Sequence, residues 1–280
     1  MISKGSAFFK ILRPLNIFQS AVAVIITATL FANIPPLSII LLGIFVTASF
    51  LGGGNAINDY FDAEIDQINR PGRPIPSGRL TKQEVMLFSA LSFSAGIMAF
   101  IPIATTISTL ILVINLVLLI LYTPMLKPTA FWGNLTVSYL LGSTFLFSAE
   151  IFGELQKGTI PAILAFLFNL ARELIKDMED LEGDRKNHLR TLPIMIGPES
   201  SKKISALFIV IILAFCFVPY SLQIYGLWYL LAVIFSVEIP LLFVLYLLRI
   251  SNEKRDYSRI SNIMKILVFC GLISIYLGKF

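Results

Sequence analysis

Long apolar runs separated by short polar segments dominate this chain. Each run is about 20 residues long, which is the length of α-helix that crosses the hydrocarbon core of a bilayer. The runs are continuous and do not alternate between apolar and polar positions, which argues against a membrane β-barrel. The pattern predicts an all-α integral membrane protein with nine transmembrane helices, at roughly 14–33, 37–58, 84–102, 105–124, 131–150, 159–177, 204–222, 226–248 and 262–279.

The composition agrees with a membrane protein. Hydrophobic residues make up 56% of the 280 residues and charged residues only 14%, whereas soluble domains carry about 25% charged residues. The mean hydropathy is +0.83. A soluble core of this size could not bury so much apolar surface, so lipid must cover it. We expect residues 1–280 to form a single transmembrane domain.

Positive charges predict how the bundle is oriented. Of the 22 lysines and arginines, 20 fall in the N-terminal segment, around the loops after the second, fourth and sixth spans, or in the region from the end of the eighth span to the start of the ninth. The other two are Lys157 and Lys279. By the positive-inside rule these segments are cytoplasmic, which predicts a multi-pass protein of the cell membrane. The net charge of +5 therefore indicates membrane lipids and anionic substrates rather than nucleic acid as partners.

Two acidic stretches follow the second and sixth predicted spans. Their oxygen-bearing side chains share a helical spacing that places them on one helix face: Asn58, Asp62 and Asp66 in the first stretch, and Asp177, Asp180 and Asp184 in the second. Neighbouring carboxylates repel each other, and magnesium ions bridging the two stretches would compensate this repulsion with the oxygen ligands that Mg²⁺ prefers. The alternative is that both stretches are ordinary solvated helix ends.

Cations flank both stretches. Arg70 and Arg73 follow the first in a proline-stiffened loop, and Lys176 and Lys186 surround the second. Carboxylates, magnesium and cationic side chains together suit a diphosphate ligand. The alternative is that these cations only reflect the positive-inside bias. His188 is the only histidine, and both cysteines lie in apolar runs, so the sequence excludes a zinc site or a disulfide framework.

At these residues the sequence resembles the UbiA superfamily of intramembrane prenyltransferases. The signatures of that family stand here, in order, as Arg13-Pro14-x-Asn16, Asn58-Asp59-x-x-Asp62-x-x-x-Asp66, Arg73-Pro74-x-x-Ser77-Gly78, Tyr122 to Lys127, and Asp180-x-x-x-Asp184. The resemblance implies helices around a central cavity with a cytoplasmic cap. It also implies Mg²⁺-dependent transfer of a prenyl group from an isoprenyl diphosphate to an acceptor nucleophile.

The resemblance carries roles onto individual residues. Asp62, Asp66, Asp180 and Asp184 would be catalytic, and together with Asn58 and Asp177 they would hold the metal. Substrate binding would fall to Arg13, Asn16, Arg70, Arg73, Tyr122, Lys127, Lys176 and Lys186.

The acceptor is predicted from the region before the second motif. Family members that act on aromatic acids often carry tyrosine where this chain has Lys176. The run from Arg172 to Asp184 resembles the archaeal branch, which joins geranylgeranyl diphosphate to the hydroxyl of geranylgeranylglyceryl phosphate, a lipid-phosphate acceptor. We expect Lys176 to bind the acceptor phosphate, although it could instead pair with Asp177 or Asp180.

Three other functions are alternatives to this interpretation. A UbiA-type enzyme with a hydroxybenzoate or a quinone precursor as acceptor is the nearest alternative. A CDP-alcohol phosphatidyltransferase would need Asp-Gly within its acidic motif, and this chain lacks that dipeptide. A cation transporter would carry its carboxylates near the middle of the membrane, away from arginines.

Overall fold

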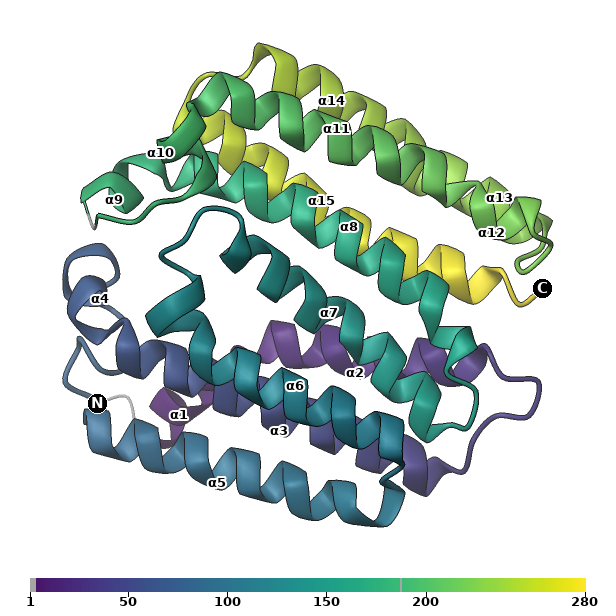
Figure 1. Ribbon diagram of the computed structural model, residues 1–280, viewed down its shortest axis with the longest axis horizontal. Coiled ribbons are helices and arrows are strands. Elements are labelled where there is room, and N and C mark those ends of the chain that lie inside the picture. The colour runs from purple at the N-terminus through teal and green to yellow at the C-terminus, as the bar shows by residue number, and fades with distance from the viewer. Residues whose placement is uncertain (1–3, 187) are drawn as a thin grey trace.

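The computed structural model describes residues 4–186 and 188–280, and every regular element in these ranges is helical. Figure 1 shows long helices lying side by side along one direction. The helices that make up the bundle are α1 (Lys4–Leu12), α2 (Pro14–Thr29), α3 (Leu37–Phe61), α5 (Lys82–Phe100), α6 (Thr106–Leu121), α7 (Trp132–Ile151), α8 (Gln156–Glu179), α11 (Pro198–Cys216), α13 (Leu227–Val233), α14 (Ile239–Ile250) and α15 (Lys254–Leu277).

Several of these helices can cross a membrane. Within residues 4–186 and 188–280, seven helical segments are long and apolar enough: Leu37–Phe61, Lys82–Ile103, Thr106–Leu126, Gln156–Glu179, Pro198–Ser221, Leu227–Ile250 and Lys254–Leu277. Short turns extend α5 by Ile101–Ile103 and α6 by the π-helical turn η2 (Tyr122–Leu126), while η3 (Ile234–Glu238) joins α13 to α14. Helices α1 and α2 meet at a bend of 47° and count as an eighth segment if they are taken as one. The protein is therefore a multi-pass helical membrane protein.

The predicted span 131–150 coincides with α7, which is 20 residues long but is not among the seven apolar segments. Its buried positions include many small or polar side chains, among them Thr136, Ser138, Ser143 and Ser148. Small and hydroxyl-bearing residues let membrane helices approach closely and hydrogen-bond. The low hydropathy of α7 thus follows from contacts with protein rather than with lipid.

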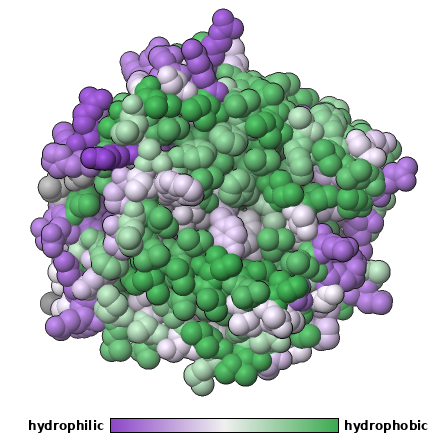
Figure 2. All heavy atoms as spheres, in the orientation of Figure 1, coloured by the Kyte–Doolittle hydropathy of each residue, from purple (hydrophilic) through white to green (hydrophobic). Residues whose placement is uncertain are grey.

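The outside of the bundle is apolar, as lipid contact requires. Leu41, Leu91, Leu110, Leu207 and Leu242 are all more than half exposed. Figure 2 shows apolar atoms across the middle of the molecule, with hydrophilic atoms gathered at one end and fewer at the other. The crowded end carries the short helices α4 (Ala63–Asn69), α9 (Leu181–Lys186) and α10 (Leu192–Ile196), as Figure 1 shows.

Glycines permit a close contact between α7 and α8. A Cβ added at Gly142 would lie 2.7 Å from the backbone oxygen of Ala162, and one added at Gly158 would lie 2.7 Å from the Ala149 Cβ. By contrast, a Cβ at Gly271 on α15 meets no atom within 4 Å. Backbone cannot move aside as a flexible side chain can.

We therefore expect Gly142→Ala to lower the free energy of unfolding by about 1–3 kcal/mol through overpacking. The matched control Gly271→Ala should leave stability unchanged or raise it by up to about 1 kcal/mol, since alanine favours helix. Thermal unfolding in detergent followed by size-exclusion chromatography measures both variants. Equal melting temperatures for the two variants would contradict this account of the contact between α7 and α8.

Candidate active site

A cavity of about 490 Å³ lies inside the bundle. Most of its wall is apolar and includes Phe50, Phe145, Phe168 and Ile212. Among the described residues its charged lining is Arg13, Arg172, Glu173, Lys176 and Lys265, and its polar lining includes Asn16, Asn58 and Tyr122. The cavity is therefore a largely apolar chamber whose polar lining includes Asn58 of the first predicted motif and Lys176, which directly precedes the second.

The first acidic motif lies where α3 gives way to α4. Helix α3 ends at Phe61, Asp62 forms the joint, and α4 begins at Ala63. The sequence spacing predicts one shared helix face for Asn58, Asp62 and Asp66, without indicating the joint at Asp62. However, Asp62 N donates to Asn58 O at 2.9 Å and Asp66 N donates to Asp62 O at 2.8 Å. Because the i to i−4 hydrogen bonds continue through the joint, the motif keeps its helical register.

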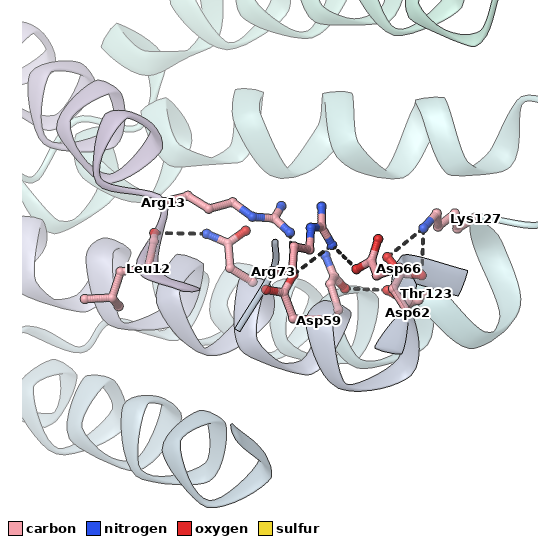
Figure 3. A network of polar contacts seen from close by, with 10 residues as sticks. Leu12, Arg13, Asp59, Asp62, Asp66, Arg73, Thr123 and Lys127 are labelled. Carbon is pink, nitrogen blue, oxygen red and sulfur yellow. Dashed lines mark hydrogen bonds and ion pairs between the residues drawn. The ribbon is translucent and has the colours of Figure 1, made fainter. Parts of the chain in front are cut away.

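Three carboxylates of this motif are buried and paired with cations, as Figure 3 shows. Arg73 donates to Asp59 at 3.0 Å and to Asp66 at 2.5 Å, and Arg13 donates to Asp59 at 2.8 Å. Arg13 sits at the bend between α1 and α2 with φ of +52°. A non-glycine residue held in this region stores strain, which concentrates at functional sites.

Lys127 is positioned by the π-helical turn η2. Its backbone N–H donates to Tyr122 O at 2.7 Å, across five residues, and its ammonium lies 2.7 Å from both carboxylate oxygens of Asp62. Thr123, in the same turn, donates to the side-chain oxygen of Asn58 at 2.5 Å. Such π-turns occur often at functional sites, and this one ties the end of α6 to the first motif.

The second acidic motif has the same construction. Helix α8 ends at Glu179, Asp180 forms the joint, and α9 begins at Leu181. Asp184 N donates to Asp180 O at 2.9 Å, so helical register again continues. Asn134 on α7 donates to Asp177 at 2.8 Å.

A small pocket of about 80 Å³ lies at the second motif and extends to Lys127. It is lined by Asp177, Asp180 and Asp184 together with Lys127, whose ammonium contacts Asp62 of the first motif. Tyr122, Glu173 and Lys176 line both this pocket and the large cavity. The two motifs are at least 111 residues apart along the chain, from Asp66 to Asp177, and Lys127 links them.

Carboxylates outside the spans carry unfavourable charge. Burial raises the pKa of Asp66 above its ordinary value, against the opposing effect of Arg73. Burial also raises the pKa of Asp184 to about 6, and the neighbouring Asp180 carboxylate adds to the rise. Within the described ranges no three Asp, Glu, His or Cys side chains are grouped tightly enough to hold a metal ion by themselves. The predicted metal ligation therefore stays a prediction.

The predicted substrate-binding residues divide into two groups. Arg13, Asn16, Tyr122, Lys127 and Lys176 line one or both cavities, and Arg73 pairs with the first motif. Arg70 and Lys186 are exposed and line neither cavity. Lys176 does not pair with Asp177 or Asp180 among the ion pairs of the described chain; its ammonium lies 3.7 Å from Glu173.

Sequence reasoning missed several polar residues of the site. Asp59 belongs to the first signature yet was given no role, although its carboxylate joins Arg13 to Arg73. Glu173 and Lys265 also line the large cavity. Both lie inside predicted spans, and a charged residue within a span is a functional candidate by that fact alone.

Comparison with known proteins decides the family. The sequence profile of the UbiA prenyltransferase family matches residues 18–269. The chain belongs to this family. A digeranylgeranylglyceryl phosphate synthase from Thermococcus kodakarensis is 35% identical over 276 residues, which cover 98% of each chain. Another from Methanosphaera stadtmanae is 34% identical and covers 97% of this chain and 98% of the relative.

Solved structures of the UbiA family share the fold. A structure of digeranylgeranylglyceryl phosphate synthase superposes with a TM-score of 0.82 at 31% identity, covering 99% of this chain and 98% of that chain. A UbiA homologue from Archaeoglobus fulgidus bound to GPP and Mg²⁺ superposes with a TM-score of 0.68 at 14% identity, covering 96% of this chain and 99% of that chain.

Proposed function

We propose that this protein transfers a geranylgeranyl group from geranylgeranyl diphosphate to the free hydroxyl of geranylgeranylglyceryl phosphate, forming the second ether bond of an archaeal lipid. The observation that carries the proposal is the 35% identity, over 98% of both chains, with a relative of that activity by name. The largely apolar cavity with acidic motifs at its polar region supports it.

The donor chemistry of the two motifs fits Mg²⁺. Asn58, Asp62 and Asp66 would supply oxygen ligands from one side, and Asp177, Asp180 and Asp184 from the other, which is the ligand type that Mg²⁺ prefers. The raised pKa values of Asp66 and Asp184 support the need for a compensating cation there. When bound, Mg²⁺ would neutralise charge on the diphosphate and make it a better leaving group.

The cations of the site have the complementary task of binding diphosphate oxygens. Lys127 lies between the motifs and Arg73 lies beside Asp66, so both are in reach of a diphosphate held there. In the reaction the bond between the prenyl C1 and the diphosphate oxygen breaks, and the acceptor hydroxyl oxygen forms a new bond to C1 and gives up its proton. Fixed cations stabilise the charge that develops on the departing diphosphate.

The apolar wall of the cavity suits the hydrocarbon part of both substrates. Phe50, Phe145 and Phe168 would pack against the prenyl tail and keep water from an allylic cation at C1. Aromatic faces also attract cations. Water exclusion matters because hydrolysis would compete with transfer to the acceptor.

The number and the orientation of the membrane crossings are also part of the proposal. We infer nine membrane crossings, with α2 and α7 added to the seven apolar segments, in a single domain that spans the chain. The N-terminus and the segments around α4, α9 and α10 would face the cytoplasm and cap the cavity. The segregation of lysine and arginine to these segments supports that orientation.

Product analysis tests this function. Protein in membranes or nanodiscs is incubated with geranylgeranyl diphosphate, Mg²⁺ and, separately, geranylgeranylglyceryl phosphate or 4-hydroxybenzoate. We expect mass spectrometry to find a digeranylgeranylglyceryl phosphate only with the first acceptor. A prenylated hydroxybenzoate without any diether would replace the proposed acceptor with an aromatic one. Absence of diphosphate release with any acceptor would refute prenyl transfer.

A further inference from the structure

Three cations that line the large cavity come from the neighbouring helices α8 and α15. Arg172 and Lys176 belong to α8, and Lys265 belongs to α15, which packs beside α8. Lys265 lies within electrostatic reach of both other cations. Glu173 is the one carboxylate that lines the cavity with them. We name Arg172, Lys176 and Lys265 the α8–α15 cation cluster.

Glu173 does not satisfy the whole cluster. Arg172 donates to Glu173 at 2.7 Å through Nη1, and Lys176 lies 3.7 Å from the same carboxylate. Lys265 forms no ion pair in the described part of the chain and only donates to Asn262 at 3.3 Å. The buried Arg172 Nε has no hydrogen-bond partner among the described residues. Within the lining of the large cavity the three cations of the cluster outnumber the carboxylate of Glu173, although Glu179 also interacts electrostatically with Lys265, and Asp177 and Asp184 interact with Lys176.

Cations that outnumber the carboxylate in the same cavity lining, together with the buried Arg172 Nε that has no partner among the described residues, indicate an anionic ligand. Lys265 lies within the predicted span 262–279, and charged side chains inside a membrane face polar partners or water because lipid does not solvate them. A phosphate monoester carries a charge of about −1.5 to −2 near pH 7 and presents three acceptor oxygens. Its negative charge is complementary to the cations of the cluster, and its oxygens can accept from the free Arg172 Nε and the Lys265 ammonium.

The geometry keeps this cluster distinct from the diphosphate region yet next to it. Tyr122, Glu173 and Lys176 line both the large cavity and the small pocket of the second acidic motif. A phosphate on the α8–α15 cation cluster and a diphosphate at the acidic motifs would therefore flank this shared boundary. Two substrates bound in this way would bring their reacting ends together inside the cavity.

Lys265 is also accessible. It is exposed while it lines the cavity, as is Asn16 on α2, and a Cβ at the nearby Gly271 would meet open space. The cavity thus reaches the surface where α2 and α15 face each other. An amphiphile that enters there from the membrane would meet Lys265 with its polar head.

We propose that the α8–α15 cation cluster binds the phosphate monoester of the lipid acceptor, with Glu173 holding Arg172 in position. This inference rests on the proposed function, since it assigns the acceptor of that reaction its binding groups. It extends the role expected of Lys176 to a three-residue site and adds Lys265 as a determinant of acceptor specificity.

The test pairs a residue with the chemical group it is proposed to bind. Kinetics are measured for wild type and Lys265→Gln with geranylgeranylglyceryl phosphate and with the unphosphorylated geranylgeranylglycerol. We expect Lys265→Gln to raise the KM for the phosphorylated acceptor about tenfold, the size expected for one charge-assisted hydrogen bond. The KM for geranylgeranyl diphosphate and the kinetics with the unphosphorylated acceptor should stay within about twofold, because the effects of removing either partner do not add.

Lys203→Gln is the matched control, since Lys203 is an exposed lysine of α11 that lines neither cavity; it should behave as wild type. A selective rise in the KM for geranylgeranyl diphosphate would assign the cluster to the donor and overturn the inference. An equal effect of Lys265→Gln on both acceptors, or no effect, would overturn it as well.

A binding measurement separates this inference from the proposed transfer reaction. Geranylgeranylglyceryl phosphate without any diphosphate is expected to raise the melting temperature of wild type and of Lys203→Gln, but to raise that of Lys265→Gln much less. If this result is obtained while no diether forms, the phosphate site stands and the proposed function is wrong. If the lipid phosphate stabilises wild type and Lys265→Gln equally, the phosphate site is wrong whatever the product analysis gives.

Discussion

Asp62→Asn and Asp180→Asn, made separately, are each expected to lower kcat at least about 100-fold, the scale on which loss of one preorganised electrostatic group affects an active site. Asparagine keeps the size of each side chain and removes its charge. Asp62 contacts Lys127 with both oxygens, and Asp180 lines the pocket that Lys127 shares. Because Lys127 contacts Asp62 and lines the pocket of Asp180, the two variants should fail alike. Release of diphosphate from geranylgeranyl diphosphate in the presence of acceptor measures both.

Glu64→Gln is the matched control for this pair. Glu64 lies on α4, two residues after Asp62, but its side chain is 84% exposed and pairs with Lys82 at the surface. It should retain activity within about twofold, since exposed ion pairs contribute little. Size-exclusion profiles should match wild type for all three variants. Near-normal turnover in either Asp62→Asn or Asp180→Asn would mean that the corresponding motif takes no part in catalysis.

Removal of divalent metal is expected to reduce diphosphate release to less than about 1% of its starting rate, and excess Mg²⁺ should restore it. The reason is the charge of the site: Asp66 and Asp184 have raised pKa values because they are buried, and Asp180 adds repulsion at Asp184. A diphosphate brings more negative charge to these carboxylates. Without a divalent cation, Lys127 and Arg73 would have to compensate the negative charge of the carboxylates as well as that of the diphosphate.

EDTA treatment followed by exchange into metal-free buffer provides the measurement, and EDTA preloaded with Mg²⁺ is the control for effects of the chelator on the membrane. Full turnover in metal-free buffer would show that the cationic side chains suffice and would remove magnesium from the account. Restoration by Ca²⁺ as complete as by Mg²⁺ would show that metal size has no influence on the site.

The membrane bundle could be predicted from the sequence because lipid imposes a simple rule on length and hydropathy. That rule takes no account of contacts between helices, and such contacts explain where the structure differs from the predicted spans. Helix α7 is less apolar because many of its side chains contact protein. The sharp bend between α1 and α2 lies at Arg13, whose left-handed backbone is held by tertiary contacts that no local pattern encodes.

The acidic motifs could be predicted for a similar reason, since helical spacing is local. The cation that pairs with each carboxylate, by contrast, depends on the tertiary fold and not on the spacing within the motif. Lys127 reaches Asp62 across 65 residues, and Arg73 rather than the adjacent Arg70 turns toward Asp66. Lys265 escaped notice because the positive-inside rule already explained lysines near that loop, although its position within a span distinguished it.

The joint action of the two acidic motifs is tested most directly by equilibrium binding of a non-reactive allylic diphosphate analogue, such as geranylgeranyl thiolodiphosphate, measured by calorimetry with and without Mg²⁺. We predict that wild type binds the analogue only in the presence of Mg²⁺. Binding should be at least about tenfold weaker in both Asp62→Asn and Asp180→Asn. Binding of equal strength without Mg²⁺, or undiminished binding to either variant, would contradict a diphosphate site that both motifs build together.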